Sequence, residues 1–142
     1  MGFRVEKDVM VSMRDGVALA TDLWIPDGGP APVLVVRLPY GKDLIPGEIT
    51  WPTQPNILAL LESGYAVVLQ DCRGTFRSGG DFRPMEREPR DGADTIAWVL
   101  EQTWCDGTVG TYGHSYLGMT QWASAAEQPA GLKAIAPTET TT

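Results

Sequence analysis

The sequence predicts an α/β fold, in which a doubly wound, mostly parallel sheet follows an antiparallel hairpin at the N-terminal end. Two apolar runs, residues 33–38 and 65–71, have the near-continuous hydrophobic character of strands that are buried on both faces. Segments with helical spacing of apolar residues lie between and after these runs. Strand and helix patterns therefore alternate along the chain, which is typical of parallel strands joined by right-handed crossovers.

The N-terminal hairpin is predicted from two strand-like runs and the turn between them. Residues 9–13 and 17–25 are rich in apolar and β-branched residues, and the Asp-Gly pair 15–16 lies between them. Asp-Gly in this setting is a strong signal for a tight hairpin turn. The loop PDGGPAP, residues 26–32, then leads into the first buried strand.

Helical and strand-like segments alternate in the rest of the chain. Residues 39–54 contain several prolines and glycines and are expected to be irregular. The later segments are, in chain order, a helix at 55–64, a strand at 65–71, a loop at 72–84, a helix at 90–104, a strand at 107–112, a helix at 115–128 and a strand at 132–137.

Apolar side chains mark the faces of these elements that should be buried. The inward positions that we expect are Ile57, Leu58, Leu60 and Leu61 in the first helix and Ile96, Ala97, Val99 and Leu100 in the second. The tryptophans that we interpret as core residues are Trp24, Trp98, Trp104 and Trp122.

Composition restricts the classes of function. The chain has 142 residues, 43% of them hydrophobic, which is enough for one globular domain with a core. Its net charge is −7 and its basic residues are scattered, so we expect no nucleic-acid partner. No apolar run approaches the roughly 20 residues that span a bilayer, so we expect no membrane association. The N-terminus lacks the apolar stretch of a signal peptide, so we expect a cytoplasmic protein.

The two cysteines give no sign of a metal site. Cys72 and Cys105 are far apart and have neither CxxC nor Cys/His ligand spacing. They are interpreted as buried free thiols of a cytosolic protein. The cysteines therefore predict no metal site.

A serine between two glycines is the main candidate for chemistry. Ser115 follows Gly113 by two residues and precedes Gly118 by three, at the seam between a predicted strand and a predicted helix. A nucleophilic serine needs such a strand-to-helix turn, which exposes its hydroxyl beside the backbone N–H groups of a helix N-terminus. The usual pattern is G-x-S-x-G, and its second glycine position is occupied here by Leu117. The alternative is a glycine-rich turn in which Ser115 only caps the helix.

A base for this serine is not evident in the sequence. The chain has one histidine, His114, and adjacent residues at such a turn point in different directions. In this type of site the chain order is serine, then acid, then histidine, and no histidine follows Ser115. A serine–lysine dyad with Lys42 or Lys133 is conceivable, but no pattern places either lysine beside the serine.

Several separated motifs resemble one family of serine hydrolases. The stretches, in order, are DVMVSMRDGVALATDLWIP, VLVVRLPYGK, GYAVVLQDCRGTFRSGGDF, WCDGTVGTYGHSYLGMTQW and LKAIAP. They resemble the family that includes bacterial cocaine esterases, X-prolyl dipeptidyl peptidases, α-amino-acid ester hydrolases and cephalosporin-type acylases. The resemblance extends over residues 5–137 and favours the cocaine esterase branch.

The resemblance implies an α/β-hydrolase domain and a set of site residues. Ser115 would be the nucleophile, and the Tyr40 phenol and the Tyr116 backbone N–H would donate to the oxyanion. A loop after a central strand lies on the active-site rim, and a phenol is a directional donor, which supports this role for Tyr40. Without the resemblance, a Tyr40 ring packed on Pro39 is an equal alternative. Gln54 matches a position that lines the substrate pocket in the esterase branch.

The stretch DCRGTFRSGG is interpreted as architecture. Arg73 should anchor this loop through a carboxylate or through backbone carbonyl groups, and Gly74 should allow the turn.

The family members are several hundred residues long and place the acid, the histidine, a helical cap and a C-terminal β domain after this region. The resemblance thus implies that residues 1–142 are the N-terminal portion of a single catalytic domain, incomplete at the C-terminus. The strand at 132–137 would then be an exposed sheet edge. We expect the isolated chain to be poorly soluble and to have negligible esterase activity.

Three functions remain open at this stage. The first is a serine hydrolase that cleaves small acyl esters, and possibly amides, through an acyl-enzyme on Ser115. The second is an X-prolyl dipeptidyl peptidase on the same scaffold, which would act on short peptides and need an acidic pocket for the substrate amine. The third is a non-catalytic pseudo-hydrolase or interaction module.

Overall fold

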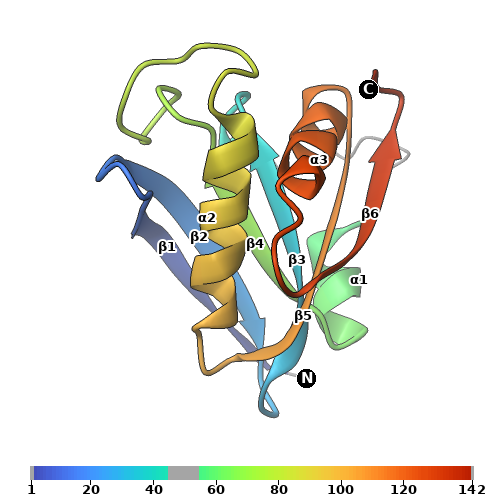
Figure 1. Ribbon diagram of the computed structural model, residues 1–142. Helices are drawn as coiled ribbons and strands as arrows, with labels where there is room; N and C mark the ends of the chain where they lie inside the picture. Colours follow the sequence, from blue (N-terminus) through green and yellow to red (C-terminus); the bar gives the residue numbers. More distant parts are fainter. Residues whose placement is uncertain (1, 45–54, 142) are drawn as a thin grey trace.

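The structure is a computed structural model, and it describes residues 2–44 and 55–141. Its described residues contain one six-stranded sheet with the strand order β1-β2-β4-β3-β5-β6 (Figure 1). The strands are β1 (Phe3–Ser12), β2 (Ala18–Pro26), β3 (Ala31–Leu38), β4 (Ala66–Asp71), β5 (Cys105–His114) and β6 (Leu132–Thr138). The helices are the 3₁₀ turn η1 (Lys42–Leu44), α1 (Ile57–Glu62), α2 (Glu88–Leu100) and α3 (Tyr116–Ala126).

The pairing confirms the predicted fold class. Strand β2 pairs antiparallel with both β1 and β4, whereas β3, β4, β5 and β6 pair in parallel. Leu38 at the end of β3 lies opposite Asp71 at the end of β4, and His114 at the end of β5 lies opposite Thr138. The carboxyl ends of the parallel strands therefore meet at one edge of the sheet, drawn at the top of Figure 1.

Helices cover both faces of the sheet. Strand β3 is buried on both sides because its alternate residues point to opposite faces. Val33 and Val35 pack with residues of α2 in one cluster, and Val36 and Leu38 pack with residues of α1 in the other. Helices α2 and α3 lie side by side on the first face, and α1 lies on the second (Figure 1). This arrangement is the doubly wound topology that the alternating pattern predicted.

Several element boundaries differ from the prediction. Strand β1 begins six residues earlier than expected, at Phe3, because it is a largely exposed edge strand whose first half is charged. A bulge interrupts it between Glu6 and Val9. Helix α2 begins two residues early, at Glu88, and ends four residues early, at Leu100, so that β5 starts at Cys105.

Three predicted inward residues are wrong. Leu58 is 49% exposed because α1 has six residues, and its buried face consists of Ile57 and Leu61. Ala97 is exposed because the buried face of α2 is partly polar. Trp122 is 42% exposed, since α3 turns toward the molecule a face that is rich in polar residues. Apolar spacing alone misidentifies faces of this kind.

The described chain also bears on three smaller predictions. Both cysteines are free thiols, although Cys105 is only half-buried while Cys72 is fully buried. Strand β6 is the last strand of the sheet and pairs with β5, as expected of an edge strand. Within residues 2–44 and 55–141, no helix is both long and apolar enough to cross a bilayer.

Candidate active site

Ser115 occupies a strained turn between β5 and α3. Its backbone has φ 55° and ψ −126°, a conformation that a residue with a Cβ rarely adopts. The Ser115 N–H donates to the Thr138 carbonyl at 3.1 Å, and the Ser115 carbonyl accepts from the Thr140 hydroxyl at 2.7 Å. Gly118 and Met119 of α3 also donate their N–H groups to this carbonyl. These contacts hold the turn on both sides and leave the serine side chain exposed.

The two glycines of the motif are required by close approach. Gly113 has φ 138°, and a Cβ at this position would lie 2.5 Å from the Leu117 Cβ. A Cβ on Gly118 would lie 2.5 Å from the Thr140 Cγ2. Both distances are too short for real contacts, so neither position has room for a side chain. The spacing G-x-S-x-x-G thus fits a turn in which Leu117 packs directly over Gly113.

The Ser115 side chain faces Tyr40 and does not cap the helix. Ser115 precedes the first turn of α3, yet its side chain makes no capping hydrogen bond. Its Oγ instead lies 3.5 Å from the Tyr40 hydroxyl, which is at the limit of hydrogen-bond distance. The Tyr40 side chain is 45% exposed on the loop that follows β3. The structure therefore brings together two residues that are 75 positions apart in the sequence.

Buried charges anchor the loop that carries Tyr40. The Lys42 N–H donates to Asp71 Oδ1 at 2.7 Å, and the Lys42 Nζ lies 2.6 Å from Asp8 Oδ1 and 2.8 Å from Asp22 Oδ1. Burial alone would lower the pKa of Lys42, but the carboxylates of Asp22 and Asp8 raise it above its usual range. Lys42 therefore remains a protonated structural cation, which makes it unsuitable as a base for Ser115. Lys133, the other lysine considered, is exposed on β6.

Tyr116 contributes a backbone donor and an anchored side chain. It is the first residue of α3, so its N–H has no acceptor within the helix. Its hydroxyl donates to Glu88 Oε1 at 3.1 Å and accepts from the Met85 N–H at 3.1 Å. Burial raises the pKa of the Tyr116 phenol, so the phenol stays protonated and can donate.

Sequence reasoning missed the buried charges behind this site. Arg37 and Glu88 are both about 3% exposed, and Arg37 Nη1 donates to Glu88 Oε2 at 2.7 Å. Arg37 Nε also donates to the Gln70 side chain at 2.8 Å. The available signal was a charged residue within the otherwise apolar strand VLVVRL. Glu88 gave no comparable signal, because acidic residues are common at helix N-termini.

The interpretation of the loop after β4 is confirmed. Arg73 makes a bidentate contact with Asp91, with Nε and Nη2 at 2.9 and 2.7 Å from its two oxygens, and it also pairs with Asp15. The loop is therefore anchored by carboxylates. Gly74 has φ 70°, and a Cβ there would collide with the backbone of Phe82.

The remaining candidates contribute less to the site. His114 ends β5 and is buried, whereas its neighbour Ser115 is exposed, so the two side chains lie in different surroundings. Gln54 lies outside the described residues. No group of three or more His, Cys, Asp or Glu side chains in the described part of the chain is arranged to hold a metal ion.

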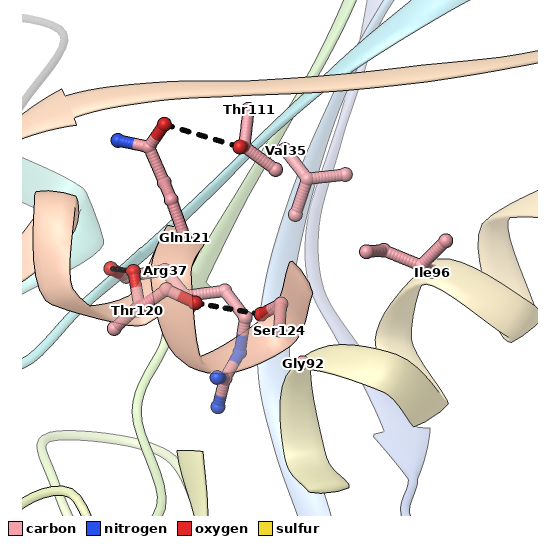
Figure 2. A pocket seen from close by; sticks show the side chains of 8 residues that line it. All are labelled: Val35, Arg37, Gly92, Ile96, Thr111, Thr120, Gln121 and Ser124. Carbon is pink, nitrogen blue, oxygen red and sulfur yellow. Dashed lines mark hydrogen bonds between the residues drawn. The ribbon is translucent and has the colours of Figure 1, made fainter. Parts of the chain in front are cut away.

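A small cavity lies apart from Ser115, between the sheet and helices α2 and α3. Figure 2 shows polar side chains of α3 on one side of it and Val35 and Ile96 on another. Its volume of about 10 Å³ is room for roughly one water molecule, so it is too small for a substrate. Its lining residues are Val35, Arg37, Gly92, Ile96, Thr111, Thr120, Gln121 and Ser124.

Comparisons with known proteins identify the family of the chain. The family described as X-Pro dipeptidyl-peptidase (S15 family) matches residues 15–142. The chain is 53% identical over 137 residues to the cocaine esterase of Rhodococcus sp. strain MB1 Bresler, which corresponds to 95% of this chain and 23% of that protein. The chain thus spans about a quarter of the length of this relative.

Solved structures of hydrolases share the fold of this chain. A CocE/NonD family hydrolase from Staphylococcus aureus superposes with a TM-score of 0.84 at 35% identity, covering 95% of this chain and 27% of that one. An α-amino acid ester hydrolase superposes with a TM-score of 0.84 at 29% identity, covering 98% of this chain and 25% of that one. The predicted resemblance and the α/β-hydrolase type of fold are therefore confirmed. The chain belongs to the X-Pro dipeptidyl-peptidase (S15) family.

Proposed function

We propose that these residues form part of a serine hydrolase that cleaves acyl esters through an acyl-enzyme on Ser115. One observation carries the proposal: the exposed Ser115 hydroxyl, in a strained strand-to-helix turn, lies 3.5 Å from the Tyr40 hydroxyl. The strained turn presents the hydroxyl at the sheet edge where α/β enzymes bind their ligands. A phenol beside it is positioned as a donor for the charge that develops during acyl transfer.

The reaction follows from these positions. The Ser115 Oγ attacks the ester carbonyl carbon while a base takes its proton, and the carbonyl oxygen becomes an oxyanion. The Tyr40 hydroxyl and the Tyr116 N–H donate hydrogen bonds to that oxyanion. Collapse of the tetrahedral intermediate expels the alcohol, which receives the proton from the base. Water, activated by the same base, then releases the acid and restores the serine.

The base and its orienting acid come from outside these 142 residues in this proposal. The chain has one histidine, which is buried next to the nucleophile, and Lys42 is locked in an ion-pair cluster. A histidine oriented by a carboxylate would supply the missing step. No cofactor is required by this chemistry.

The names of the relatives suggest the substrate class. One relative is a cocaine esterase and a structural neighbour is an α-amino acid ester hydrolase, and both names denote ester cleavage. We therefore assign this chain small-molecule acyl esters as substrates. Binding would take place on the open surface around Ser115 and Tyr40.

A second function is favoured by the family match. The matching family is named for X-Pro dipeptidyl-peptidase activity. The same serine could then form an acyl-enzyme with a dipeptide that ends in proline. Parallel assays with a 4-nitrophenyl ester and an Xaa-Pro-4-nitroanilide distinguish the two, and we expect the larger kcat/KM on the ester.

The test compares three forms of the natural gene product that contains these residues: the unmodified protein, Ser115→Ala, and Ser63→Ala as an exposed-serine control. We expect ester turnover that Ser115→Ala abolishes and Ser63→Ala leaves unchanged. Equal turnover in Ser115→Ala would refute the nucleophile. A folded product with no turnover on either substrate would favour a non-catalytic role.

A further inference from the structure

We propose that the buried carboxylate of Glu88, held by Arg37, positions the backbone N–H of Tyr116 for oxyanion binding by clamping the Tyr116 phenol. This inference rests on the proposed function, because it concerns the geometry of the same site. Glu88 and Arg37 are positioning residues, since neither reaches the reacting atoms.

The clamp connects the first residues of two neighbouring helices. Glu88 begins α2 and Tyr116 begins α3, and the two helices lie side by side on one face of the sheet (Figure 1). The Tyr116 hydroxyl donates to Glu88 Oε1 and accepts from the Met85 N–H, both at 3.1 Å. The phenol is therefore held from two directions, and its free rotation is lost.

Glu88 is itself fixed by a buried cation. Its second oxygen, Oε2, accepts from Arg37 Nη1 at 2.7 Å, and Arg37 Nε donates to Gln70 Oε1 at 2.8 Å. An ion pair this deeply buried gains little net stability over an apolar pair, because desolvation offsets the attraction. Stability alone therefore does not account for the buried charge of Arg37 in an otherwise apolar strand, or for its pairing with Glu88 of α2.

The role that we assign to the Arg37–Glu88 pair is to help hold the strained turn at Ser115. A residue at φ 55° and ψ −126° persists only where the surrounding structure holds it in that conformation. On one side, the Ser115 N–H is bound to the Thr138 carbonyl. On the other side, the next residue is Tyr116, whose phenol is bound to Glu88. The clamp thus limits the directions that the Tyr116 N–H can take.

Arg37 also connects the Tyr116 N–H to the second proposed oxyanion donor, the Tyr40 hydroxyl. It lies in β3, three residues before Tyr40, and its carbonyl accepts from the Thr120 hydroxyl of α3 at 3.2 Å. Arg37 therefore contacts α3, which carries the Tyr116 N–H. It also lies in β3, the strand that leads to the Tyr40 phenol. The spacing of the two oxyanion donors depends on its position.

The test uses Tyr116→Phe, which keeps the ring and the backbone N–H but removes the hydroxyl, in the natural gene product. Activity is expressed per active site titrated with a fluorophosphonate, so that loss of folded protein does not count. We expect kcat to fall about 10-fold with KM changed less than 2-fold, because a misplaced donor weakens only the transition state. A boronic acid that mimics the tetrahedral intermediate should bind about 10-fold more weakly.

Two further variants complete the design. Glu88→Gln retains an acceptor for the phenol but loses the charge for Arg37, so its kcat should fall less than that of Tyr116→Phe. Tyr112→Phe removes another buried phenol hydroxyl three residues before Ser115 and should leave kcat and boronate affinity unchanged.

The outcomes separate this inference from the proposed function. Unchanged kcat and boronate affinity per active site in Tyr116→Phe, while Ser115→Ala is inactive, would overturn the clamp alone. The clamp would also be overturned if the total activity of Tyr116→Phe fell only in proportion to the number of titrated active sites. Such a fall would show that less protein had folded and that each folded site was unchanged. Full turnover in Ser115→Ala would overturn the proposed function, and the clamp with it.

Discussion

Ser115 combines an exposed hydroxyl with a backbone conformation, φ 55° and ψ −126°, that disfavours any side chain bearing a Cβ. Glycine tolerates such conformations, while at ordinary positions it is less stable than alanine by about 0.5–1 kcal/mol. At this residue, strain should therefore make a glycine variant more stable than an alanine variant, which is the reverse of the usual order. Relief of strain is worth about 1–3 kcal/mol, which exceeds the entropic penalty of glycine.

The first prediction follows from this reversal. Ser115→Gly should be more stable than Ser115→Ala, by about 1–2 kcal/mol, because only glycine relaxes the turn. Thermal unfolding midpoints of the two variants of the natural gene product measure the difference. As a control, Ala126→Gly at the exposed end of α3 should lower the midpoint. An equal or lower midpoint for Ser115→Gly would contradict the claim that the turn is strained.

The second prediction concerns Tyr40. Tyr40→Phe removes the hydroxyl that lies 3.5 Å from Ser115 Oγ and should reduce kcat about 10²–10³-fold, with little change in KM. The magnitude is that of losing one oxyanion donor. Steady-state kinetics on a nitrophenyl ester measure it. Tyr65→Phe, which alters a tyrosine in the loop before β4, should retain normal kcat, and a normal kcat in Tyr40→Phe would remove the phenol from the mechanism.

Single residues differ in how far the sequence predicts them. The positions of Ser115, Gly113 and Gly118 are local, so their spacing was sufficient to expect a turn, and the structure has one. Tyr40 was expected from a family resemblance, and the tertiary fold brings it to the serine. Glu88 could not be predicted, because it meets Tyr116 across 28 positions only when two helices pack together.

Among the elements, helix α2 carries acidic side chains that bind arginine residues from other parts of the chain. Beyond Glu88 and Asp91, it carries Asp94, whose carboxylate binds the Arg14 backbone N–H at 2.8 Å and Arg14 Nη2 at 2.7 Å. Arg14 lies in the turn between β1 and β2. This contact joins the hairpin to the helix layer.

The third prediction is a dependence of stability on pH. Burial would raise the pKa of Asp94, but its hydrogen bonds with Arg14 lower it below the unfolded value. The unfolded state then binds more protons, so stability rises with pH. The contribution is present in full above about pH 4 and is lost as pH falls through the lowered folded pKa.

Asp94→Asn should therefore unfold at a lower temperature than the unmodified protein at pH 6, and the difference should shrink between about pH 4 and pH 2. Unfolding midpoints across this range provide the measurement, with exposed Asp81→Asn as the control for loss of one carboxylate. A difference that stays constant over the whole range would show that the pair does not link stability to pH.

Element types were predicted better than element faces. The central strands β3 and β4 are mostly apolar on both faces, so their sequences predict burial. The buried face of α2 contains Glu88, Asp91 and Thr95, which apolar periodicity cannot reveal. Gly92 in the same helix approaches α3 so closely that a Cβ would lie 1.8 Å from the Ser124 Oγ. Such a close approach depends on tertiary packing, which the local pattern does not contain.

At the scale of the whole sheet, β6 is an edge strand among the described residues. This strand pairs with β5, and exposed residues on it include Lys133, Ala134 and Ala136. An unpaired strand edge offers N–H and C=O groups to another chain and favours association. Charged side chains at such an edge oppose this pairing.

The fourth prediction concerns the 142-residue polypeptide expressed by itself. It should associate with rising concentration, and Ala136→Lys on β6 should reduce association, whereas Ala59→Lys on exposed α1 adds the same charge away from the edge and should not. Sedimentation velocity over a range of concentrations measures this. Equal association of the two variants would show that the β6 edge is not responsible.

The overall order of strands and helices was predictable because each crossover repeats one local pattern. The order β2-β4-β3-β5 in the sheet, by contrast, depends on which strands pair, and sequence patterns do not specify those partners. The same pairing brings the ends of β3 and β5 together and so places Tyr40 beside Ser115. The site is therefore a consequence of topology as much as of its motif.

The central claim is that Ser115 carries the acyl group during turnover. The most direct measurement is to mix the natural gene product with 4-nitrophenyl benzoate, quench it in acid within the burst, and map peptides by mass. We predict that the peptide containing Ser115 gains the mass of one benzoyl group, and that Ser115→Ala shows no adduct. A benzoyl group on a different residue, or steady turnover with no adduct in any quenched sample, would contradict this account.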